Sequence, residues 1–401
     1  MSASHRRPIA LAALLALTSC GGGGGDPGAV TTPVPTPAPS PSPSPSPSPT
    51  PTPTPAPVAT QNVAKAVIAT FDAPWAMTFL PDGRMLVTEK AGVLRLATQA
   101  GAKVSVGGVP PVVYAGQLGF QDVILDPAFA TNRRIYLSYA EAASGGQRLA
   151  VARATLNLDA APRLDDLTVI WRATPATTGG QLGARLAFSL DGQSLFVTSG
   201  ERQQGTPAQD MGGTLGKIVR IRADGSIPAD NPFAGRTDAK AEIWTLGHRN
   251  PYGLAYDLTG RLWSHEMGPA GGDELNLIEP GKNYGWPRVS NGSNYDGTPI
   301  PDHSPGDGYA APAVSWSPVI SPAGLIFYSG TLFTGWRGDA ILGGLTSQGL
   351  VRVRISGTSA SEVQRVPLGA RIREVEQGPD GAIWVLEDAP TGRLLKLTPA
   401  P

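Results

Sequence analysis

Residues 75–96 read WAMTFLPDGRMLVTEKAGVLRL, and this stretch decides the fold. An apolar run ends at a tight turn, Asp82-Gly83, and two further apolar runs follow it. Short runs of aliphatic and aromatic residues separated by Asp-Gly turns are typical of antiparallel strands joined as hairpins. No long helical period accompanies them. The stretch therefore predicts a small β-meander.

The same unit returns along the chain, beginning at Gln121, Arg185, Tyr252, Ala323 and Ile372. Six units in about 335 residues, or roughly 56 residues each, have the period of a propeller. We therefore expect an all-β fold, a six-bladed β-propeller whose blades are four-stranded antiparallel sheets. A pair of β-sandwiches is the alternative, but it would not explain the recurring unit. Since blades bury their faces against each other, residues 62–401 are expected to form one domain.

The first 20 residues, MSASHRRPIALAALLALTSC, differ from the rest of the chain. A basic start precedes an apolar run that is too short to span a bilayer, as in an export signal. The ending Leu-Thr-Ser-Cys resembles a bacterial lipobox, which implies lipidation of Cys20 and, with Gly21 next, an outer-membrane location facing the periplasm. A plain secretory signal is the alternative. Cys20 is the only cysteine, so no internal disulfide is expected in the mature protein.

Residues 21–61 are rich in Gly, Pro and Ser, and from Pro33 to Pro57 every second residue is proline. Such a run favours extended polyproline II and would reach roughly 80 Å at about 3.1 Å per residue. It predicts a disordered stalk that holds the propeller off a membrane; a ligand for proline-binding modules is the alternative. The formal net charge is +0 and no basic patch occurs, so a nucleic-acid partner is not expected.

The most unusual segment is residues 247–287, GHRNPYGLAYDLTGRLWSHEMGPAGGDELNLIEPGKNYGWP. Arg249 and Asn250 place a fixed cation and a planar amide just before a strand, where they suit carboxylate or quinone oxygens. Asp273 and Glu274 follow a Gly-rich stretch whose carbonyls are free to turn. Carboxylates with free carbonyls are ligands that Ca²⁺ prefers. The residues thus indicate either a Ca²⁺ site or an ordinary acidic turn.

This segment, with PWAMTFLPDGRMLVTE, GQLGFQDVILDPAFATNRRIYLSY and AQDMGGTLGKIVRIRADGSIPADNPF, resembles one family. It is that of the soluble PQQ-dependent glucose/sorbosone dehydrogenases, the six-bladed aldose sugar dehydrogenases, and the resemblance covers about residues 72–397. It implies a PQQ- and Ca²⁺-dependent oxidoreductase. A hydride would pass from a sugar to PQQ, the sugar's proton to a histidine, and the electrons to an acceptor that the sequence does not identify.

The resemblance also implies roles by position for the residues that would hold PQQ. Arg249 and Asn250 match the pair that binds PQQ. Arg371 and Arg373, in the motif RIRE, match two arginines that bind its carboxylates.

Further positions imply metal and substrate sites. The carbonyls of Gly268 and Pro269 match those that bind the Ca²⁺ contacting PQQ. Glu274 and the carbonyl of Tyr284 match a second, structural Ca²⁺ site. Gln117 matches a glutamine that lines the substrate pocket.

Two positions depart from the family in ways that bear on catalysis. The family's base histidine stands four residues before the arginine of the motif RLxF, here Arg185, and that position is Gln181. Gln181 and Arg185 are thus the catalytic candidates, although a neutral amide cannot accept a proton. A cofactor-contacting lysine is replaced by Thr346, and a residue that touches PQQ in some relatives is Val319. The chain's four histidines all lie elsewhere.

Three functional hypotheses remain open. In the first, the chain oxidises a sugar and the base has moved, to Glu201 or to a water held by Gln181. In the second, the propeller binds Ca²⁺ and a ligand at the channel mouth but oxidises nothing. The third is a Ca²⁺-dependent lactone hydrolase, which would need a cluster of Glu, Asn and Asp side chains at the channel mouth that is not evident in the sequence.

Overall fold

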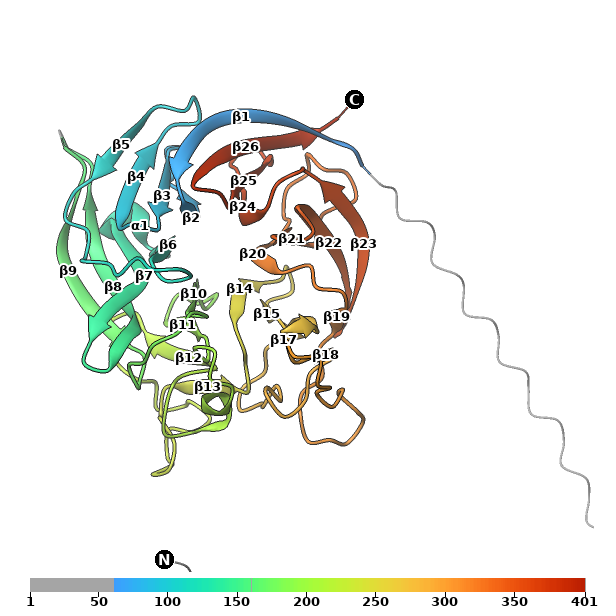
Figure 1. The fold of residues 1–401 in the computed structure, drawn as a ribbon. Helices are drawn as coiled ribbons and strands as arrows, with labels where there is room; N and C mark the ends of the chain where they lie inside the picture. Colours follow the sequence, from blue (N-terminus) through green and yellow to red (C-terminus); the bar gives the residue numbers. More distant parts are fainter. Residues whose placement is uncertain (1–60, 160, 401) are drawn as a thin grey trace, which may run out of the picture. The chain divides into compact units, whose positions relative to one another are not determined.

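The computed structural model describes residues 61–159 and 161–400 (Figure 1). Six four-stranded antiparallel sheets surround a central channel, which confirms the predicted six-bladed propeller. The predicted signal, Cys20 and the stalk up to residue 60 lie outside the described residues. Among the described residues, no helix is long and apolar enough to cross a membrane.

Each blade runs from an innermost strand beside the channel to an outermost strand at the rim (Figure 1). The innermost strands are β2 (Pro74–Phe79), β6 (Phe120–Leu125), β10 (Gly183–Phe188), β14 (Pro251–Tyr256), β20 (Pro322–Phe327) and β24 (Ile372–Gln377). The second strands are β3 (Met85–Glu89), β7 (Arg134–Ala143), β11 (Ser194–Ser199), β15 (Leu262–Glu266), β21 (Ala340–Gly344) and β25 (Ile383–Glu387). The third strands are β4 (Val93–Ala97), β8 (Gly146–Asn157), β12 (Lys217–Arg222), β17 (Asp273–Leu277), β22 (Gly349–Ser356) and β26 (Thr391–Pro399).

The outermost strands complete the blades. They are β5 (Lys103–Val106), β9 (Arg163–Arg172), β13 (Ile243–Leu246), β19 (Val314–Trp316), β23 (Ser359–Pro367) and β1 (Val63–Asp72). Outside the blades lie the short pair β16 (Ala270–Gly271) and β18 (Gly292–Ser293), the helix α1 (Phe129–Asn132) and the 3-10 turn η1 (Thr206–Gln209).

The ring is closed by the two ends of the described chain. β1 pairs antiparallel with β26, from Val63 opposite Pro399 to Asp72 opposite Thr391. The last blade therefore takes its outer strand from the start of the chain and its other three strands from the end.

The hydrophobic core is divided among the interfaces between consecutive blades. Adjacent residues on a second strand point to opposite faces, so they enter different interfaces. On β7, Ile135 packs toward the preceding blade and Tyr136 toward the following one. On β15, Leu262 packs toward the preceding blade and Trp263 toward the following one. Because both faces of these strands are buried, their sequences are nearly continuous apolar runs rather than alternating ones.

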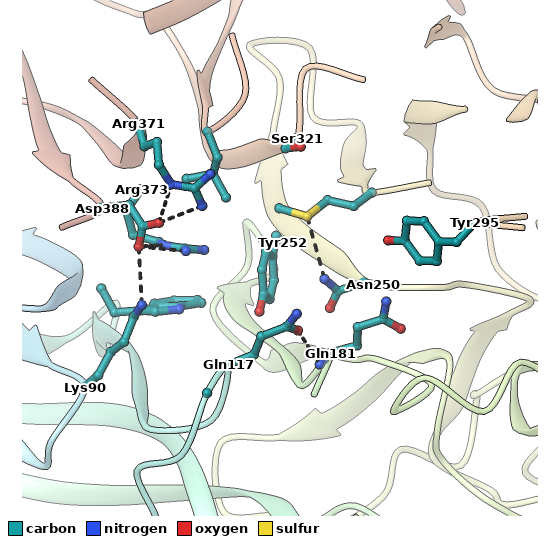
Figure 2. A pocket seen from close by; sticks show the side chains of 14 residues that line it. Lys90, Gln117, Gln181, Asn250, Tyr252, Tyr295, Ser321, Arg371, Arg373 and Asp388 are labelled. Carbon is teal, nitrogen blue, oxygen red and sulfur yellow. Dashed lines mark hydrogen bonds and ion pairs between the residues drawn. The ribbon is translucent and has the colours of Figure 1, made fainter. Parts of the chain in front are cut away.

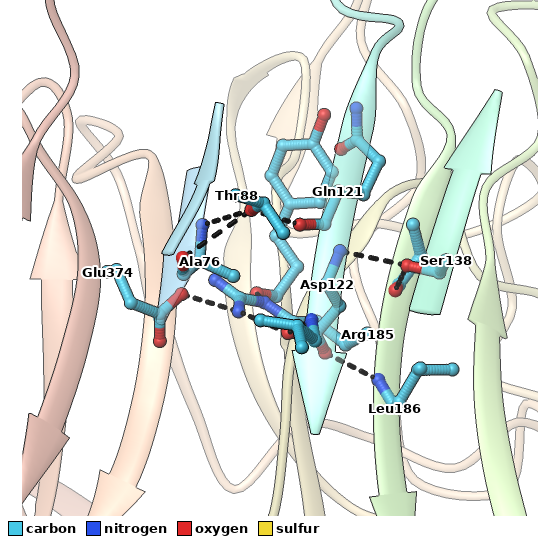
Figure 3. A network of polar contacts seen from close by, with 12 residues as sticks. Ala76, Thr88, Gln121, Asp122, Ser138, Arg185, Leu186 and Glu374 are labelled. Carbon is cyan, nitrogen blue, oxygen red and sulfur yellow. Dashed lines mark hydrogen bonds and ion pairs between the residues drawn. The ribbon is translucent and has the colours of Figure 1, made fainter. Parts of the chain in front are cut away.

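Buried hydroxyls join neighbouring blades at β-bulges in the innermost strands (Figure 3). Thr88 Oγ1 accepts from the Ala76 amide at 3.0 Å and donates to the Gln121 carbonyl of the next blade at 2.6 Å. Ser138 does the same between Asp122 and Ala184, and Thr198 between Arg185 and Pro251. Each of these amides lies in a bulge of its own strand. The bulge therefore frees an amide that the hydroxyl satisfies.

Candidate functional site

One end of the ring carries the candidate site, and the turns between the innermost and second strands lie at the other. In each hairpin the turn follows the innermost strand, so the start of that strand and the end of the second strand share the opposite end of the blade. Gln181, Arg249 and Arg371 come just before innermost strands, whereas Lys90 and Asp388 come just after second strands. Six rigid blades therefore present their loops around one opening.

A first cavity of about 320 Å³ lies at this opening (Figure 2). Its volume falls in the usual range for small-molecule sites. Trp75 and Tyr252 give it aromatic surfaces that pack edge to face, with ring centroids 5.9 Å apart. The lining comprises Trp75, Lys90, Gly116, Gln117, Gln181, Asn250, Tyr252, Met267, Tyr295, Ser321, Leu345, Arg371, Arg373 and Asp388.

One side of this cavity is a cationic wall, formed by Lys90, Arg371, Arg373 and Asp388 (Figure 2). Asp388 accepts from Arg371 at 2.8 Å, from Arg373 at 2.8 Å and from Lys90 at 3.3 Å. Burial alone would raise the pKa of Asp388, but Arg373 and Lys90 hold that pKa well below its usual value. Three cations share one carboxylate, so the wall has an excess positive charge for an anionic ligand.

The opposite side is built on the Gly-rich loop before β10. Gln181 has a φ of 52°, and its amide donates to Gln117 Oε1 at 2.7 Å. A Cβ at Gly180 would lie 2.7 Å from that same oxygen and would displace the Gln117 side chain, whereas a Cβ at Gly179, whose φ is 101°, would lie 2.3 Å from the Arg202 carbonyl oxygen. Arg202 is buried and fixes the loop by donating to the carbonyls of Gly179 and Gly180 at 2.6 and 2.8 Å. The glycines thus serve the close packing of Gln117 and Arg202.

The Gln181 side chain connects Glu201 with Arg249, and we call these three residues the carboxylate side. The amide orientation that satisfies both neighbours directs its nitrogen to Glu201 Oε1 and its oxygen to Arg249 Nη2, which is 2.9 Å away. Glu201 Oε2 accepts from the backbone amides of Gln204 and Gly205. Burial raises the pKa of Glu201.

A second cavity of about 480 Å³ adjoins the first, and Gln181 and Tyr295 line both. Glu201 and Arg249 line the second cavity together with the rings of Trp286 and Tyr295. The Arg249 guanidinium lies 5.4 Å from the Trp286 ring centroid and donates to the Tyr295 hydroxyl at 3.0 Å. The full lining is Gln181, Glu201, Gln203, Gln204, Gly205, Thr206, Arg249, Pro269, Trp286, Pro287, Asn294 and Tyr295.

Arg249 and Asn250 are positioned by buried groups behind them. The Arg249 amide donates to Glu266 Oε2 at 2.5 Å, and Glu266 Oε1 contacts His248 Nδ1 at 2.8 Å. Arg249 Nη1 also donates to the carbonyl of Gly268 at 2.8 Å. Asn250 lines the first cavity, and its buried Oδ1 has no hydrogen-bond partner. An unsatisfied buried acceptor that lines a cavity indicates a ligand-binding position.

Two buried carboxylates, Glu266 and Glu274, lie side by side behind the second cavity. Asn276 Nδ2 donates to both, at 3.3 and 3.2 Å. Burial and then Glu266 raise the pKa of Glu274 well above its usual value. A hollow of about 10 Å³, lined by Glu266, Glu274 and Tyr284 among others, lies beside them. That volume is about the size of one water or ion.

These observations test whether Ca²⁺ fits the predicted ligands. Within the described residues, no group of three or more His, Cys, Asp or Glu side chains is arranged to hold a metal. A Ca²⁺ site at Glu274 would therefore combine two carboxylates with carbonyls such as that of Tyr284, a donor set that suits Ca²⁺. Glu266 has His248 Nδ1 at 2.8 Å and Glu274 has His303 Nε2 at 3.9 Å, but neither carboxylate forms an ion pair with a Lys or Arg side chain of the described residues, so the pair fits a cation. Asp273 does not contribute, because its oxygens accept from the amides of Gly268, Ile320 and Ser321.

PQQ fits the first cavity on the same kind of evidence. The cationic wall matches its carboxylates, Asn250 Nδ2 is a donor for its quinone oxygens, and Trp75 and Tyr252 match a planar ring. Thr346 is exposed and reaches the cavity only indirectly, through a 2.6 Å contact with Ser321.

Arg185 lies below the first cavity and lines neither cavity (Figure 3). Its guanidinium forms ion pairs with Glu374 at 2.5 Å and Asp122 at 3.5 Å. It also donates to the Tyr252 carbonyl at 2.9 Å and lies 4.2 Å from the centroid of the Trp75 ring. The structure therefore places Arg185 as a support beneath the aromatic surfaces rather than in contact with a ligand.

The sequence did not single out Lys90, Asp388, Trp286 or Tyr295, although all four line the cavities. A signal for the first two exists: each follows the last residue of a second strand, at the same place in its repeat unit. The aromatic pair comes from long irregular loops, where no period marks a position.

Comparisons with known proteins identify the family of the chain. Residues 71–396 match the family model described as Glucose / Sorbosone dehydrogenase. Aldose sugar dehydrogenase YliI of Escherichia coli (strain K12) is 40% identical over 351 residues, which cover 85% of this chain and 94% of that protein. Quinoprotein glucose dehydrogenase B of Acinetobacter calcoaceticus is 28% identical over 412 residues, or 81% of this chain and 85% of that protein.

Solved structures show the same likeness. The apo-form of the soluble aldose sugar dehydrogenase of Escherichia coli has a TM-score of 0.81 and 38% identity, covering 84% of this chain and 100% of that one. The PQQ-bound form of the aldose sugar dehydrogenase of Streptomyces coelicolor has a TM-score of 0.71 and 27% identity, covering 86% and 99%. On the strength of a match that spans nearly the whole propeller, the chain belongs to the glucose/sorbosone dehydrogenase family.

Proposed function

We propose that the protein is a PQQ- and Ca²⁺-dependent dehydrogenase that oxidises an aldose or a related sugar. The observation that carries this proposal is the first cavity, in which Lys90, Arg371 and Arg373 lie on one side and Asn250 on the other, with the Tyr252 ring between them (Figure 2). An excess of cations on one wall suits the carboxylates of PQQ. The oxidoreductase family and the PQQ-bound relative support the assignment.

The residues of the chain divide the work as follows. Arg371 and Arg373 bind the carboxylates of the cofactor, and Asn250, which lines the same cavity, orients its quinone oxygens. Arg249 lines the second cavity and donates to the carbonyl of Gly268. PQQ, when bound, supplies the acceptor for the hydride, which carries both electrons of the oxidation. Trp75 and Tyr252 exclude water from one face of the cavity, while Gln117, Gln181 and Tyr295 present hydrogen-bonding groups to a sugar beside it.

Calcium would take two places. The carbonyls of Gly268 and Pro269 would bind the ion that contacts the cofactor, and Glu274 with the Tyr284 carbonyl would bind a structural ion. The buried carboxylate pair Glu266 and Glu274 supports the second place, because a divalent cation would balance its charge.

The test is to titrate the purified chain with PQQ in the presence of Ca²⁺ and to record dye-linked oxidation of glucose and other aldoses. Saturable PQQ binding with turnover is the expected result. A chain that binds no PQQ would contradict the cofactor assignment. An Arg371→Ala, Arg373→Ala double variant is the matched control for binding through the cationic wall.

A second candidate function is a propeller that binds Ca²⁺ and a ligand at the channel mouth without oxidising it. Gln181 at the position of the family's base histidine, and Thr346 at that of its lysine, favour it. In that case PQQ would bind without turnover, and Gln181→His would create activity. Turnover in the unmodified chain would exclude this candidate.

We also propose that the chain is exported and lipid-anchored through Cys20 at the outer membrane, from its N-terminal sequence alone. Metabolic labelling with a radioactive fatty acid tests this, since Cys20→Ser should abolish the label.

A further inference from the structure

Oxidation of an alcohol removes a proton as well as a hydride, so the proposed function requires a proton acceptor within reach of the substrate hydroxyl. Gln181 cannot serve, because a neutral amide has no basic atom at useful pH. The inference below rests on the proposed function and asks which residue of this chain accepts the proton.

Few residues in the two cavities could do so. Among the described residues that line them, none is a histidine, and the carboxylates are Asp388 and Glu201. Asp388 is held by three cations, which leave it a weak base. Lys90 is not a base here, because its ammonium donates a hydrogen bond to Asp388. Tyr252 is not one either, because burial raises the pKa of its hydroxyl further above neutral.

Glu201 has the geometry of an oriented base. Backbone amides of Gln204 and Gly205 hold its Oε2, which fixes the carboxylate plane. The other oxygen, Oε1, faces the amide nitrogen of Gln181 at the junction of the two cavities. A carboxylate oxygen has two acceptor positions, and Gln181 takes one. A substrate hydroxyl in the second cavity, which Glu201 lines, would take the remaining position on Oε1.

We propose that Glu201 is the catalytic base of this enzyme and that Gln181 positions it. The sugar's O–H bond breaks and its proton goes to Glu201 Oε1. The C–H bond breaks and its electron pair leaves as a hydride to bound PQQ, while the C=O bond of the lactone product forms. The balance is one proton and one hydride, and PQQ is the oxidant that the proposed function already requires.

The surroundings of Glu201 agree with this role. Its side chain is 1% exposed, and burial raises its pKa, which makes the carboxylate a stronger base. The backbone amides and the Arg249 guanidinium oppose the rise, so the charged form remains accessible. Arg202 is the other cation near it, but its donors go to the carbonyls of Gln147, Gly179 and Gly180.

Gln181 is then a positioning residue. It donates to Glu201 and accepts from Arg249, so the amide separates a carboxylate and a guanidinium that would otherwise pair directly. A direct ion pair would lower the basicity of Glu201. Gln181, which stands at the position of the family's histidine, and the buried carboxylate of Glu201 thus act together: the amide positions the carboxylate that accepts the proton.

The first test compares Glu201→Gln with the unmodified full chain, both loaded with PQQ and Ca²⁺. We expect kcat for glucose or the best aldose of a panel to fall by about 100-fold or more, with PQQ affinity changed less than about threefold. Glu362→Gln on the outer strand β23 is the matched control and should keep full activity. Unaltered kcat in Glu201→Gln would overturn the assignment.

A second readout does not depend on the loaded enzyme. In the chain without PQQ, carbon-13 NMR of labelled glutamate carboxyls should show one resonance that titrates above the usual glutamate range and disappears in Glu201→Gln. Gln181→Leu should shift the midpoint of that same resonance, because the amide contacts Oε1. A Glu201 resonance that titrates in the ordinary range and ignores position 181 would contradict the geometry.

Chemical rescue separates a base from a merely structural carboxylate. In Glu201→Ala, added formate should restore turnover in a saturable way, since the second cavity has room for it, and the Glu362→Gln control should not respond. Absence of rescue together with a cooperative, wild-type-like melting curve would count against Glu201. PQQ binding without turnover of any aldose in the unmodified chain would also overturn the assignment, whereas failure to bind PQQ would defeat the proposed function itself.

Discussion

The cationic wall and the carboxylate side face each other across one opening, but they are built on opposite principles. On the wall, three cations surround Asp388, and Arg371 remains half-exposed. On the carboxylate side, a single buried carboxylate is separated from its nearest guanidinium by a neutral amide. The wall keeps the arginines that the family resemblance implies, whereas position 181 departs from it.

Binding of the ligand's carboxylates and removal of the proton are therefore carried by separate blades. Lys90, Arg371, Arg373 and Asp388 come from the blades that begin at β2 and β24. Gln181, Glu201 and Arg249 come from those that begin at β10 and β14. A change of base on one side therefore leaves the other side intact, and the two can be disturbed independently.

The largest expected effect is on the wall. Arg373→Ala should weaken PQQ binding by about 1,000-fold, because it removes a buried charge that contacts the ligand side of Asp388. The measurement is an absorbance titration with PQQ at fixed Ca²⁺. Arg371→Ala, at a more exposed position, should cost less. If Arg373→Ala changed the carboxyl resonance of Glu201 and not PQQ binding, the cationic wall and the carboxylate side would not be independent.

The next effect concerns the support beneath both regions. Burial raises the pKa of Glu374 to about 7 from an ordinary value of 4.5, despite Arg185. Because the pKa of Glu374 is higher in the folded than in the unfolded protein, Glu374 adds to the free energy of unfolding below about pH 4.5. This contribution is lost as the pH rises through about 7. That component amounts to about 3 kcal/mol, from about 1.4 kcal/mol per pKa unit.

Urea unfolding of the unmodified chain and of Glu374→Gln between pH 4.5 and 7.5 measures this component as the difference between the two curves. Glu374→Gln should lack it, and Glu362→Gln should retain it. Parallel curves for all three proteins would show that Glu374 does not titrate in this window.

Removal of Ca²⁺ should change the free energy of unfolding by slightly less than the titration of Glu374 does. Ca²⁺ at 100 times its Kd should raise the free energy of unfolding by about 2.7 kcal/mol over chelated protein. Glu274→Gln should remove most of that difference, because it takes away one of two adjacent carboxylates. Thermal melting with Ca²⁺ or chelator is the measurement. An equal response to Ca²⁺ in Glu274→Gln would place the ion elsewhere.

The smallest effect is expected at Gln181, the residue between Glu201 and Arg249. Gln181→Leu should lower kcat by roughly fivefold, or about 1 kcal/mol, because Glu201 and Arg249 each lose one hydrogen bond. PQQ affinity should stay within about twofold, since the wall is untouched. A large loss of PQQ affinity would mean that Gln181 belongs to the cofactor site.

Much of the fold could be predicted because its repeat is local. Each innermost strand is followed directly in sequence by its neighbour in the sheet, with Asp-Gly turns at residues 82–83, 191–192 and 380–381, so the count of six blades could be read from the chain. The pairing of β1 with β26 could not, since its partners are more than 300 residues apart in sequence and residues 63–72 carry no Asp-Gly turn.

The site was predictable where a motif marked it and not where only geometry does. The structure brings Gln117, Gln181, Asn250, Arg371 and Arg373 to one cavity. Asp388 looks in sequence like any charge after a strand, and only the convergence of blades shows that three cations meet it. Arg185 looked catalytic because it stands near Gln181, but the bulge in β10 directs it to the channel below.

The closure of the ring sets an order for folding during synthesis. β1 is among the first strands of the propeller to be made, yet its partner β26 ends at Pro399. Until those final residues exist, the first strand has an unpaired edge and the first and last blades have no common interface. Five blades can grow by adding hairpins to a neighbour, but the sixth must join two distant ends. Its formation therefore carries the largest loop-closure entropy in the molecule.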